Sequence, residues 1–587
     1  MLRFIILNMI LLIFTSIAVF CKDAPNVIYT YTLNDNGTQR SYDETIAVAC
    51  FQGILNREKP VLWINAQREK HADVWREIMS EDGRWLSGKS WKTIESLDDL
   101  RIFAGDKIKG AVIWDPTVPA TVNVGNTIAG VEDLVLLSPE FADKYLKSWN
   151  LEVKHDLRGK FTGSETGSAK NDAYRWAIRE YLQKGKCSDK FIFLNVDAWK
   201  DTRDRGILPY VMVRDWAVCN RSFVYDLSPW GDELPQDDLN QPLGTDLETY
   251  RMMLQAVLDQ TDGKSMTEMA GFFDFDKYSE FGGGKHHPVG TEWETVYLIT
   301  PYNVYQNTAD HNCYNKSFHS KFNFKNVKQK INKNPKVQLE NKAYICILMA
   351  DYDSATPLYV FLPNHWKDSK RGDIPLSWGI NPNLVDTYPD LIDYYYSTAT
   401  SNDFFVADAT CAGYFNPTRV LPRYMDLFIN HNKKYYKMLD MDISPMVLDI
   451  ASPTPLVKDA FAQFSKKGYG AMVGDWHSTG ATSPEPQIWK DMPLTVLSNT
   501  ADNEIRENNN PDGFAEWISI HVLAKAQADE PSFNYIRVVW SSPSQVIGGM
   551  EALKKQRPDL DIEVVDPYTF FELQKQYHKK NNYNVFN

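Results

Sequence analysis

The amino-acid sequence predicts an α/β fold in which N-terminal α/β domains with mainly parallel sheets precede a C-terminal, irregular β/α barrel of about seven strands. Two observations support this prediction. Short apolar runs of strand length alternate with stretches of helical apolar spacing along almost the whole chain. In the C-terminal half, acidic residues recur just after these apolar runs, at the edge where α/β proteins build their binding clefts.

The first residues are typical of an export signal. Arg3 supplies a positive charge, the run from Phe4 to Phe20 is mostly apolar, and Ser16-Ile17-Ala18 offers a small-x-small cleavage site. We expect residues 1–21 to be a signal peptide and the protein to be secreted or periplasmic. Lipid anchoring at Cys21 is the alternative. No later stretch reaches the roughly 20 apolar residues of a membrane span, so we expect no integral membrane segment after cleavage.

The composition excludes several classes of function. A net charge of −13 argues against a nucleic-acid partner. The six cysteines outside the signal are scattered, without the Cys/His spacing of structural zinc. Gly125 and Gly130 lack the dinucleotide-binding spacing, and Gly282-Gly283-Gly284 lacks the Lys-Ser/Thr ending of a phosphate loop. We therefore expect no cofactor and no metal, while the oligomeric state stays open.

Residues 22–160 are expected to form an N-terminal α/β domain that serves as a scaffold. Its predicted strands are Val27–Tyr31, Val61–Ile64, Gly110–Asp115 and Leu134–Leu137, and its predicted helices are Glu44–Leu55, Ala72–Met79 and Val122–Val131.

Residues 161–335 are expected to form a second α/β region that ends in the polar segment Lys321–Lys336. Its predicted helices are Asp172–Gln183 and Thr245–Asp262, and its predicted strands are Phe191–Asp197, Phe223–Leu227 and one starting at Gly271.

Residues 336–587 are expected to form the barrel. Its predicted strands are Tyr344–Met349, Phe404–Val406, Ser444–Asp449, Tyr469–Asp475, Pro493–Leu497, Tyr535–Trp540 and Ile562–Asp566.

Acidic residues at the ends of these strands are the candidate catalytic groups. The carboxyl ends of barrel strands share one face, and two carboxylates there supply the acid and the base or nucleophile of glycoside cleavage. The candidates are Asp351, Asp353, Asp408, Asp449, Asp475 and Glu504. The alternative for any one of them, and for Asp566, is capping of the following helix. Candidate sugar-binding residues are Trp378, Asn381, Tyr414, Trp476 and His477.

Several segments resemble a glycoside hydrolase family named for the motif Gly-x-Gly-Tyr-x-Tyr-Pro. The C-terminal segments are Trp378–Pro382, Asn402–Val406 and Ala412–Pro417, and the N-terminal ones are Ala129–Glu132, Gly244–Glu248 and Glu292–Glu294. Gly413, Tyr414 and Pro417 match the motif, whereas Cys411 replaces its first Gly and Asn416 its second Tyr. The resemblance implies an exported protein that processes polysaccharides; it assigns no catalytic residue.

The leading hypothesis is therefore an exported glycoside hydrolase acting on a poly- or oligosaccharide through paired carboxylates at the barrel mouth. A non-catalytic carbohydrate-binding protein is one alternative. A metal-dependent carbohydrate esterase is another, although no H-x-x-x-H follows Asp351 and Asp353. Serine-hydrolase chemistry lacks its G-x-S-x-G elbow.

Overall fold

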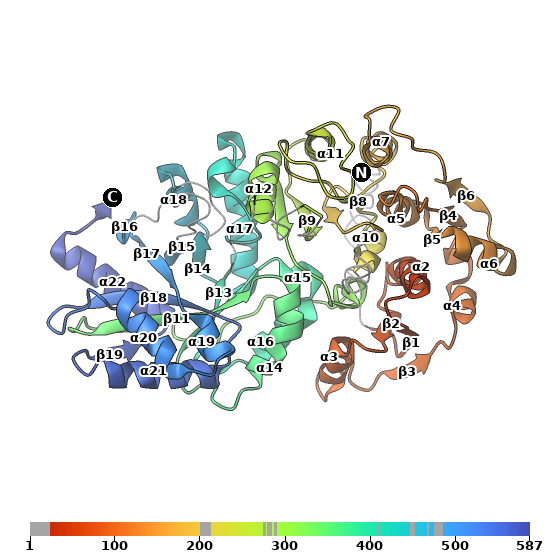
Figure 1. Ribbon diagram of the computed structural model, residues 1–587. Helices are drawn as coiled ribbons and strands as arrows, with labels where there is room; N and C mark the ends of the chain where they lie inside the picture. Colours follow the sequence, from red (N-terminus) through yellow and green to blue (C-terminus); the bar gives the residue numbers. More distant parts are fainter. Residues whose placement is uncertain are drawn as a thin grey trace, which may run out of the picture.

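The computed structural model describes residues 24–199, 213–273, 277–278, 285–286, 290–408, 410–446, 452–465, 469–474 and 485–586 (Figure 1). Over these residues the strands form three small parallel sheets and one ten-stranded sheet. The first two sheets lie at the right of Figure 1, the third near its middle, and the large sheet at its left. The predicted α/β class with mainly parallel sheets is confirmed.

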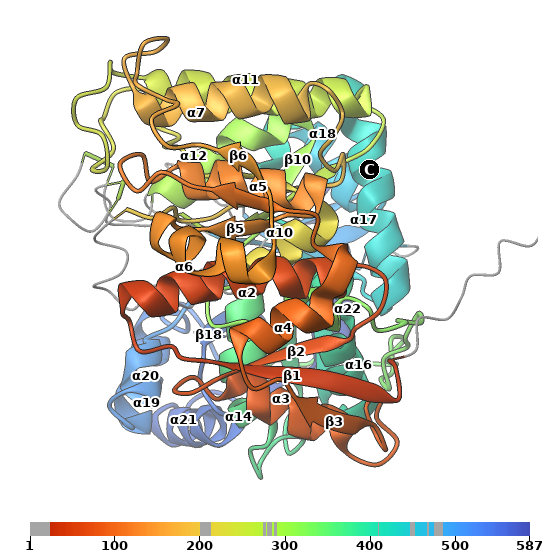
Figure 2. The same cartoon turned by 90° about the vertical axis from the view of Figure 1, so that its right-hand side faces the viewer.

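In the first sheet, β1 lies between two parallel neighbours. Helix α2 lies between this sheet and the second (Figure 2), and fourteen of its seventeen residues are buried. Because both of its sides are covered, α2 is buried almost all round and lacks a single apolar stripe. The elements are β1 (Val27–Leu33), α2 (Gln39–Leu55), β2 (Leu62–Ala66), α3 (His71–Ser80), β3 (Ser90–Thr93) and α4 (Leu97–Ala104).

The second sheet has β4 at its centre, with β5 and β6 parallel to it. The elements are η1 (Gly105–Lys107), β4 (Ala111–Ile113), α5 (Thr121–Glu132), β5 (Val135–Leu137), α6 (Pro139–Trp149) and β6 (Val153–Asp156). The sequence did not predict β3 and β6, because most of their residues are exposed and polar. Segment 24–160 thus carries two sheets.

The third sheet has the order β10-β9-β7-β8. The prediction of a strand that starts at Gly271 is wrong, because β9 ends at that residue. All residues of β9 are buried, but one of them is Glu268, so the strand does not appear in the sequence as an apolar run. The elements are α7 (Ala169–Ala177), η2 (Ile178–Leu182), β7 (Phe191–Leu194), α10 (Arg214–Asn220), β8 (Phe223–Tyr225), α11 (Thr245–Thr261), β9 (Thr267–Gly271), α12 (Gly290–Ile299), η3 (Thr300–Tyr302), β10 (Val304–Asn307) and α13 (Lys316–His319).

The C-terminal sheet is a nearly closed barrel with the strand path β13-β12-β11-β18-β17-β15-β14, each neighbouring pair parallel. Since β18 pairs with β11, the seven strands follow one another around the barrel in chain order. The strands are β11 (Ala343–Tyr352), β12 (Leu376–Ile380), β13 (Asp403–Ala407), β14 (Ile443–Met446), β15 (Gly470–Gly474), β17 (Met492–Asn499) and β18 (Ser532–Val539).

Helices and short strands complete the C-terminal part. They are η4 (Pro357–Phe361), α14 (Leu362–Trp366), α15 (Leu384–Thr387), α16 (Pro389–Thr398), η5 (Pro417–Arg419), η6 (Pro422–Tyr424), α17 (Met425–Leu439), α18 (Pro455–Phe461), β16 (Gln487–Trp489), α19 (Asp502–Arg506), α20 (Pro511–His521), α21 (Pro543–Gln556), β19 (Ile562–Val564), α22 (Pro567–Asn581) and β20 (Val585–Phe586).

The seam of the barrel lies between β13 and β14, which approach each other. Gln329, in the linker before the barrel, satisfies part of the β13 edge there. Its side-chain amide donates to the carbonyl oxygen of Phe405 at 2.9 Å and accepts from the Phe405 N–H at 2.8 Å. A linker side chain thus takes the hydrogen-bonding place of a neighbouring strand.

The predicted strand number is right, but one member differs. Leu376–Ile380, expected to be part of the cleft, forms the barrel strand β12. Ile562–Val564, expected to be the last barrel strand, pairs instead with Ala343–Ile345 at the amino end of β11. Both segments are short and mostly apolar, so the local sequence pattern does not indicate which of the two is a barrel strand.

Candidate active site

A cavity of about 360 Å³ opens at the carboxyl ends of barrel strands β11, β17 and β18. Its barrel side includes Asp351, Asp353, Asp408 and Tyr414, four of the residues predicted from the sequence. Its other side comes from the second α/β region, through helix α12 and the segment that follows β10. The cavity is therefore composite.

Asp351 is the charged partner of an arginine in this cavity. It forms an ion pair with Arg537 of β18, and both side chains are largely buried. Its main-chain oxygen accepts a hydrogen bond of 2.9 Å from the indole N–H of Trp540, which orients that ring at the cavity wall. Phe361 packs against Trp540 with ring centroids 4.8 Å apart. These two rings supply an aromatic surface beside the carboxylate.

Asp353 lies two residues further along and has a different environment. Burial raises its pKa to about 7, and the negative charge of Asp351 adds to the increase. The hydroxyl of Tyr414, which donates a hydrogen bond of 2.5 Å to Asp353 Oδ2, and the positive charge of Arg537 both oppose the increase. The raised pKa thus favours the protonated form of Asp353, beside a carboxylate that is paired with a guanidinium.

Asp408 follows β13 and is 4% exposed. It fits because its neighbour on β12 is a glycine: a Cβ on Gly379 would lie 2.3 Å from Asp408 Oδ2. Burial lowers the pKa of Arg537, but the negative charges of Asp351, Asp408 and Asp502 and the hydrogen bond to Asp351 raise it overall. Arg537 is therefore the cationic centre of the cavity.

The loop that carries Tyr414 is fixed to the second α/β region. Tyr414 and Gln306 of β10 exchange both backbone hydrogen bonds, at 2.8 and 3.1 Å. Gly413 has a φ of +102°, and a Cβ there would lie 2.4 Å from Tyr305 Cδ2. Only glycine meets both conditions, which gives the second glycine of the motif a physical reason.

Sequence reasoning missed the residues that the second region contributes. Glu292 and Trp293 of α12 line the cavity, as do Phe272 and His311. Burial lowers the pKa of His311, which favours its neutral form. The segment Glu292-Trp293-Glu294 carried one indication of functional importance, because it resembles the family. Nothing in the sequence, however, places α12 opposite a barrel strand.

Other predicted residues lie elsewhere. Trp378 is fully buried; its indole N–H donates to Asp403 at 2.8 Å, and its ring packs on Trp366. Asn381 is fully buried, and its side-chain oxygen accepts from the N–H of Asn383 at 3.0 Å. Neither lines the cavity, because the side chains point into the core.

Glu504 lies in α19 and accepts a hydrogen bond of 2.7 Å from the side chain of Asn510, which caps α20. Asp566 caps α22, as the alternative interpretation of strand-end acids predicts. Asp449, Asp475, Trp476 and His477 lie outside the described residues.

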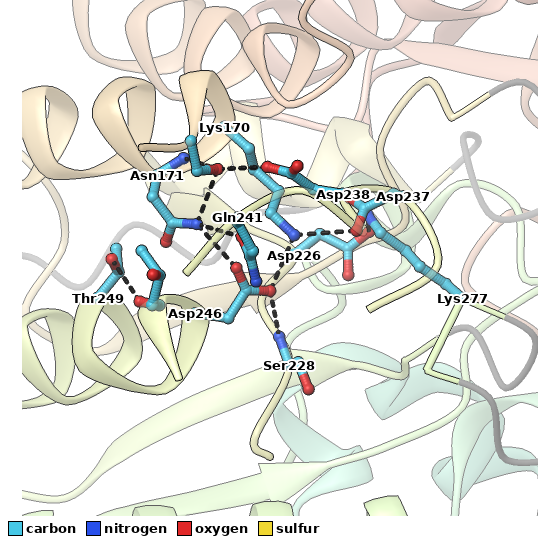
Figure 3. Close-up of polar contacts among 12 residues, drawn as sticks. Lys170, Asn171, Asp226, Ser228, Asp237, Asp238, Gln241, Asp246, Thr249 and Lys277 are labelled. Atoms are coloured by element: carbon cyan, nitrogen blue, oxygen red, sulfur yellow. Dashed lines mark hydrogen bonds and ion pairs between the residues drawn. The ribbon is translucent and has the colours of Figure 1, made fainter. Parts of the chain in front are cut away.

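A second polar cluster lies beyond the carboxyl ends of β7 and β8 and is largely buried (Figure 3). The ammonium of Lys277 lies 2.6 to 3.0 Å from the carboxylates of Asp226, Asp237 and Asp197. Lys170 bridges Asp237 and Asp246 at 2.9 and 2.8 Å. Because each of the two ammonium groups is shared between carboxylates, this cluster connects the ends of β7 and β8 with α11.

Three further observations concern the described part of the chain. Its six cysteines are buried, free thiols. No group of three or more His, Cys, Asp or Glu side chains there is arranged to hold a metal ion. Over the same residues, every helix is too short or too polar to traverse a bilayer.

Comparison with known proteins gives two matches to one family. The profile described as "GxGYxYP putative glycoside hydrolase C-terminal domain" matches residues 341–575, from β11 into α22. A profile described as "GxGYxYP_N second domain" matches residues 108–185. Together they cover more than half of the chain.

A crystal structure described as that of a putative hydrolase from Bacteroides thetaiotaomicron has the same fold. It is similar over 94% of this chain and 96% of its own, with a TM-score of 0.67 and 16% identity. A UDP-glucosyltransferase of Hordeum vulgare subsp. vulgare, UGT13248, is 26% identical over 27% of this chain, and the chain spans 35% of that protein's length. The profile matches, together with Gly413, Tyr414 and Pro417 in the loop beside the cavity, establish that the chain belongs to the GxGYxYP family.

Proposed function

We propose that this protein hydrolyses a glycosidic bond of a poly- or oligosaccharide at the composite cavity. The observation that carries the proposal is the contrast between two neighbouring carboxyl groups. Asp353 holds its proton up to about pH 7, whereas Asp351 is paired with the Arg537 guanidinium. Two titratable groups whose environments differ in this way are what acid–base catalysis requires.

In this proposal Asp353 is the general acid and donates its proton to the oxygen of the departing sugar. Asp351 acts on the other side of the bond, as a nucleophile or as the base that activates water. A separation of the two carboxyl groups of about 5 Å corresponds to the first role and of about 6.5–9.5 Å to the second. Water supplies the hydroxyl of the released sugar and restores the proton of Asp353.

The lining supports a carbohydrate substrate. Trp540, Phe361 and Trp293 present aromatic surface, and Tyr414, His311 and Arg537 present polar groups around it. Apolar walls with a few convergent polar groups are typical of small-molecule sites. The description of the matching profile as a glycoside hydrolase domain agrees with this chemistry.

We also propose that the protein is exported and loses residues 1–21. The charged start and apolar run before Cys21 support this. Intact-mass analysis of protein from the native cell envelope tests it: an acylated Cys21 would indicate a lipid anchor, and an uncleaved N-terminus would contradict export by cleavage.

A glycan screen on the purified mature protein tests the hydrolase function. It reads new reducing ends and released acetate, with and without chelator. New reducing ends that persist with chelator are the expected result. Chelator-sensitive acetate release would point to an esterase, and binding without turnover across the panel to a carbohydrate-binding protein.

A further inference from the structure

The junction between the second α/β region and the barrel closes one side of the cavity. Tyr414 pairs with Gln306 through two backbone hydrogen bonds. The backbone N–H of Thr356 donates to Ala309 at 2.8 Å, and its hydroxyl donates to the carbonyl oxygen of His311 at 2.6 Å. Tyr414, Ala309, His311 and Thr356 all line the cavity, so these bonds lie in its wall.

A third contact extends this closure. The backbone N–H of Asn416, two residues beyond Tyr414, donates to the hydroxyl of Thr300 at 3.0 Å. A carbohydrate chain that passed through the cavity would need an exit on this side, and an exit would require breaking these main-chain bonds. Over the described residues, these bonds therefore close the cavity toward the second region, and we call it blind on that side.

The size of the cavity agrees with a blind site. Its volume of about 360 Å³ is near the lower limit of the roughly 300–1,000 Å³ found for small-molecule pockets. A cavity of this size favours a ligand at the small end of that range over a chain of several sugar units.

The charged groups of the cavity further restrict which kind of sugar can bind. Four carboxyl groups line the described part of the cavity, those of Glu292, Asp351, Asp353 and Asp408, and Arg537 is the cation among them. Burial favours the neutral form of His311. A uronate or sulfated sugar would place another anion in this surrounding, at a cost in repulsion and desolvation.

We propose that the site recognises the non-reducing end of a carbohydrate chain. It removes one terminal sugar at a time from that end, and this sugar is uncharged or carries an amino group. This end-directed mode rests on the glycosidase function proposed above. Water is the co-reactant: its hydroxyl goes to the anomeric carbon of the released sugar and its proton to the oxygen of the shortened chain.

Cleavage of short linear oligosaccharides that carry a fluorophore at the reducing end tests the mode. The panel contains neutral chains, chains of amino sugars and oligogalacturonides. At early times the labelled product should be shorter by one unit, with free monosaccharide as the partner product, and the oligogalacturonides should stay intact. Internal fragments at early times, or faster cleavage of the uronate chains, would overturn the inference while leaving the hydrolase function in place.

Binding to the Asp353→Asn variant tests the same mode without turnover. Titration calorimetry compares each oligosaccharide with the same chain blocked at its non-reducing end by a benzylidene group. Blocking should weaken binding by about tenfold or more, because the blocked end does not fit the cavity. If the variant binds in an end-dependent way but the wild-type protein cleaves no glycan, the recognition mode is upheld and only the hydrolase function is rejected. Equal binding of blocked and free chains, or no binding to any chain, overturns the mode.

Discussion

The hydroxyl of Tyr414 donates a hydrogen bond of 2.5 Å to Oδ2 of Asp353. Through its backbone, the same tyrosine pairs with Gln306 of the third sheet. One residue therefore joins the proposed acid of the barrel to the scaffold that closes the cavity. Tyr414 therefore has two effects: its hydroxyl lowers the pKa of Asp353, against the effect of burial, and its backbone fixes the loop.

The variant Tyr414→Phe should shift the pH dependence of activity to higher pH. The hydroxyl stabilises the charged form of Asp353, so its removal raises the pKa of that carboxyl above about 7. Since the proposed acid must be protonated, the alkaline limb of kcat/KM should move upward by about one pH unit. An unchanged or lowered limb would show that Asp353 does not govern it.

The variant Asp351→Asn should change the pKa of Asp353 in the opposite direction. The negative charge of Asp351 contributes to the raised pKa of Asp353, and its loss leaves the opposing charge of Arg537 without this partner. Carbon-13 NMR of labelled aspartate should therefore show Asp353 titrating below its value in the wild-type protein, while Asp373→Asn, at an exposed site, should leave it unchanged. A higher titration point in Asp351→Asn would contradict the coupling of the two carboxyl groups.

The variant Gly413→Ala should destabilise the protein. Its Cβ would lie 2.4 Å from the ring of Tyr305, at a φ of +102°. The matched control is Gly83→Ala, which has a φ of +82° but nothing within 4 Å of the added carbon. Because overpacking costs about 1–3 kcal/mol, chemical denaturation should show Gly413→Ala to be less stable than Gly83→Ala by that amount. Equal stability of the two variants would mean that the ring of Tyr305 moves aside without loss of stability.

The variant Lys277→Met should lower stability much more than a surface change does. It removes an ammonium shared by three buried carboxylates and leaves their charges without it. Breaking buried ion pairs by loss of one partner costs about 3–5 kcal/mol. Lys285→Met removes a lysine that is mostly exposed and pairs with Asp232, and should change stability by less than about 0.5 kcal/mol. A similar melting temperature for both variants would contradict a structural role for the cluster.

Much of the barrel could be predicted from its sequence, because each buried strand is marked by its own local run of apolar residues. β11 is a run of apolar residues that ends in Asp351 and Asp353, and a buried parallel strand needs such a run whatever its neighbours are. The position of the two carboxylates followed from it. Among the strands that escaped prediction, β3, β6 and β9 lack this run, because they are exposed or hold a buried glutamate.

The sequence could not indicate which strand-end acids face the cavity. Asp353 and Asp566 both follow apolar runs, yet Asp353 lines the cavity and Asp566 caps a helix. Trp378 looked suitable for stacking on a sugar, but it lies in the core against Trp366. Glu292 joins the site only through packing between two sheets, a long-range relationship that local pattern does not carry.

The roles of Asp353 and Asp351 are tested most directly by comparing Asp353→Asn with Asp351→Asn on glycosides that have different leaving groups. A sugar leaving group needs a proton, whereas a dinitrophenolate departs without one. We expect Asp353→Asn to lose about 10²–10⁴-fold in kcat/KM on the natural bond and much less on the dinitrophenyl glycoside, and Asp351→Asn to be impaired on both. Equal losses of Asp353→Asn on both substrates would contradict the assignment of Asp353 as the acid, and full activity of both variants would contradict the catalytic site.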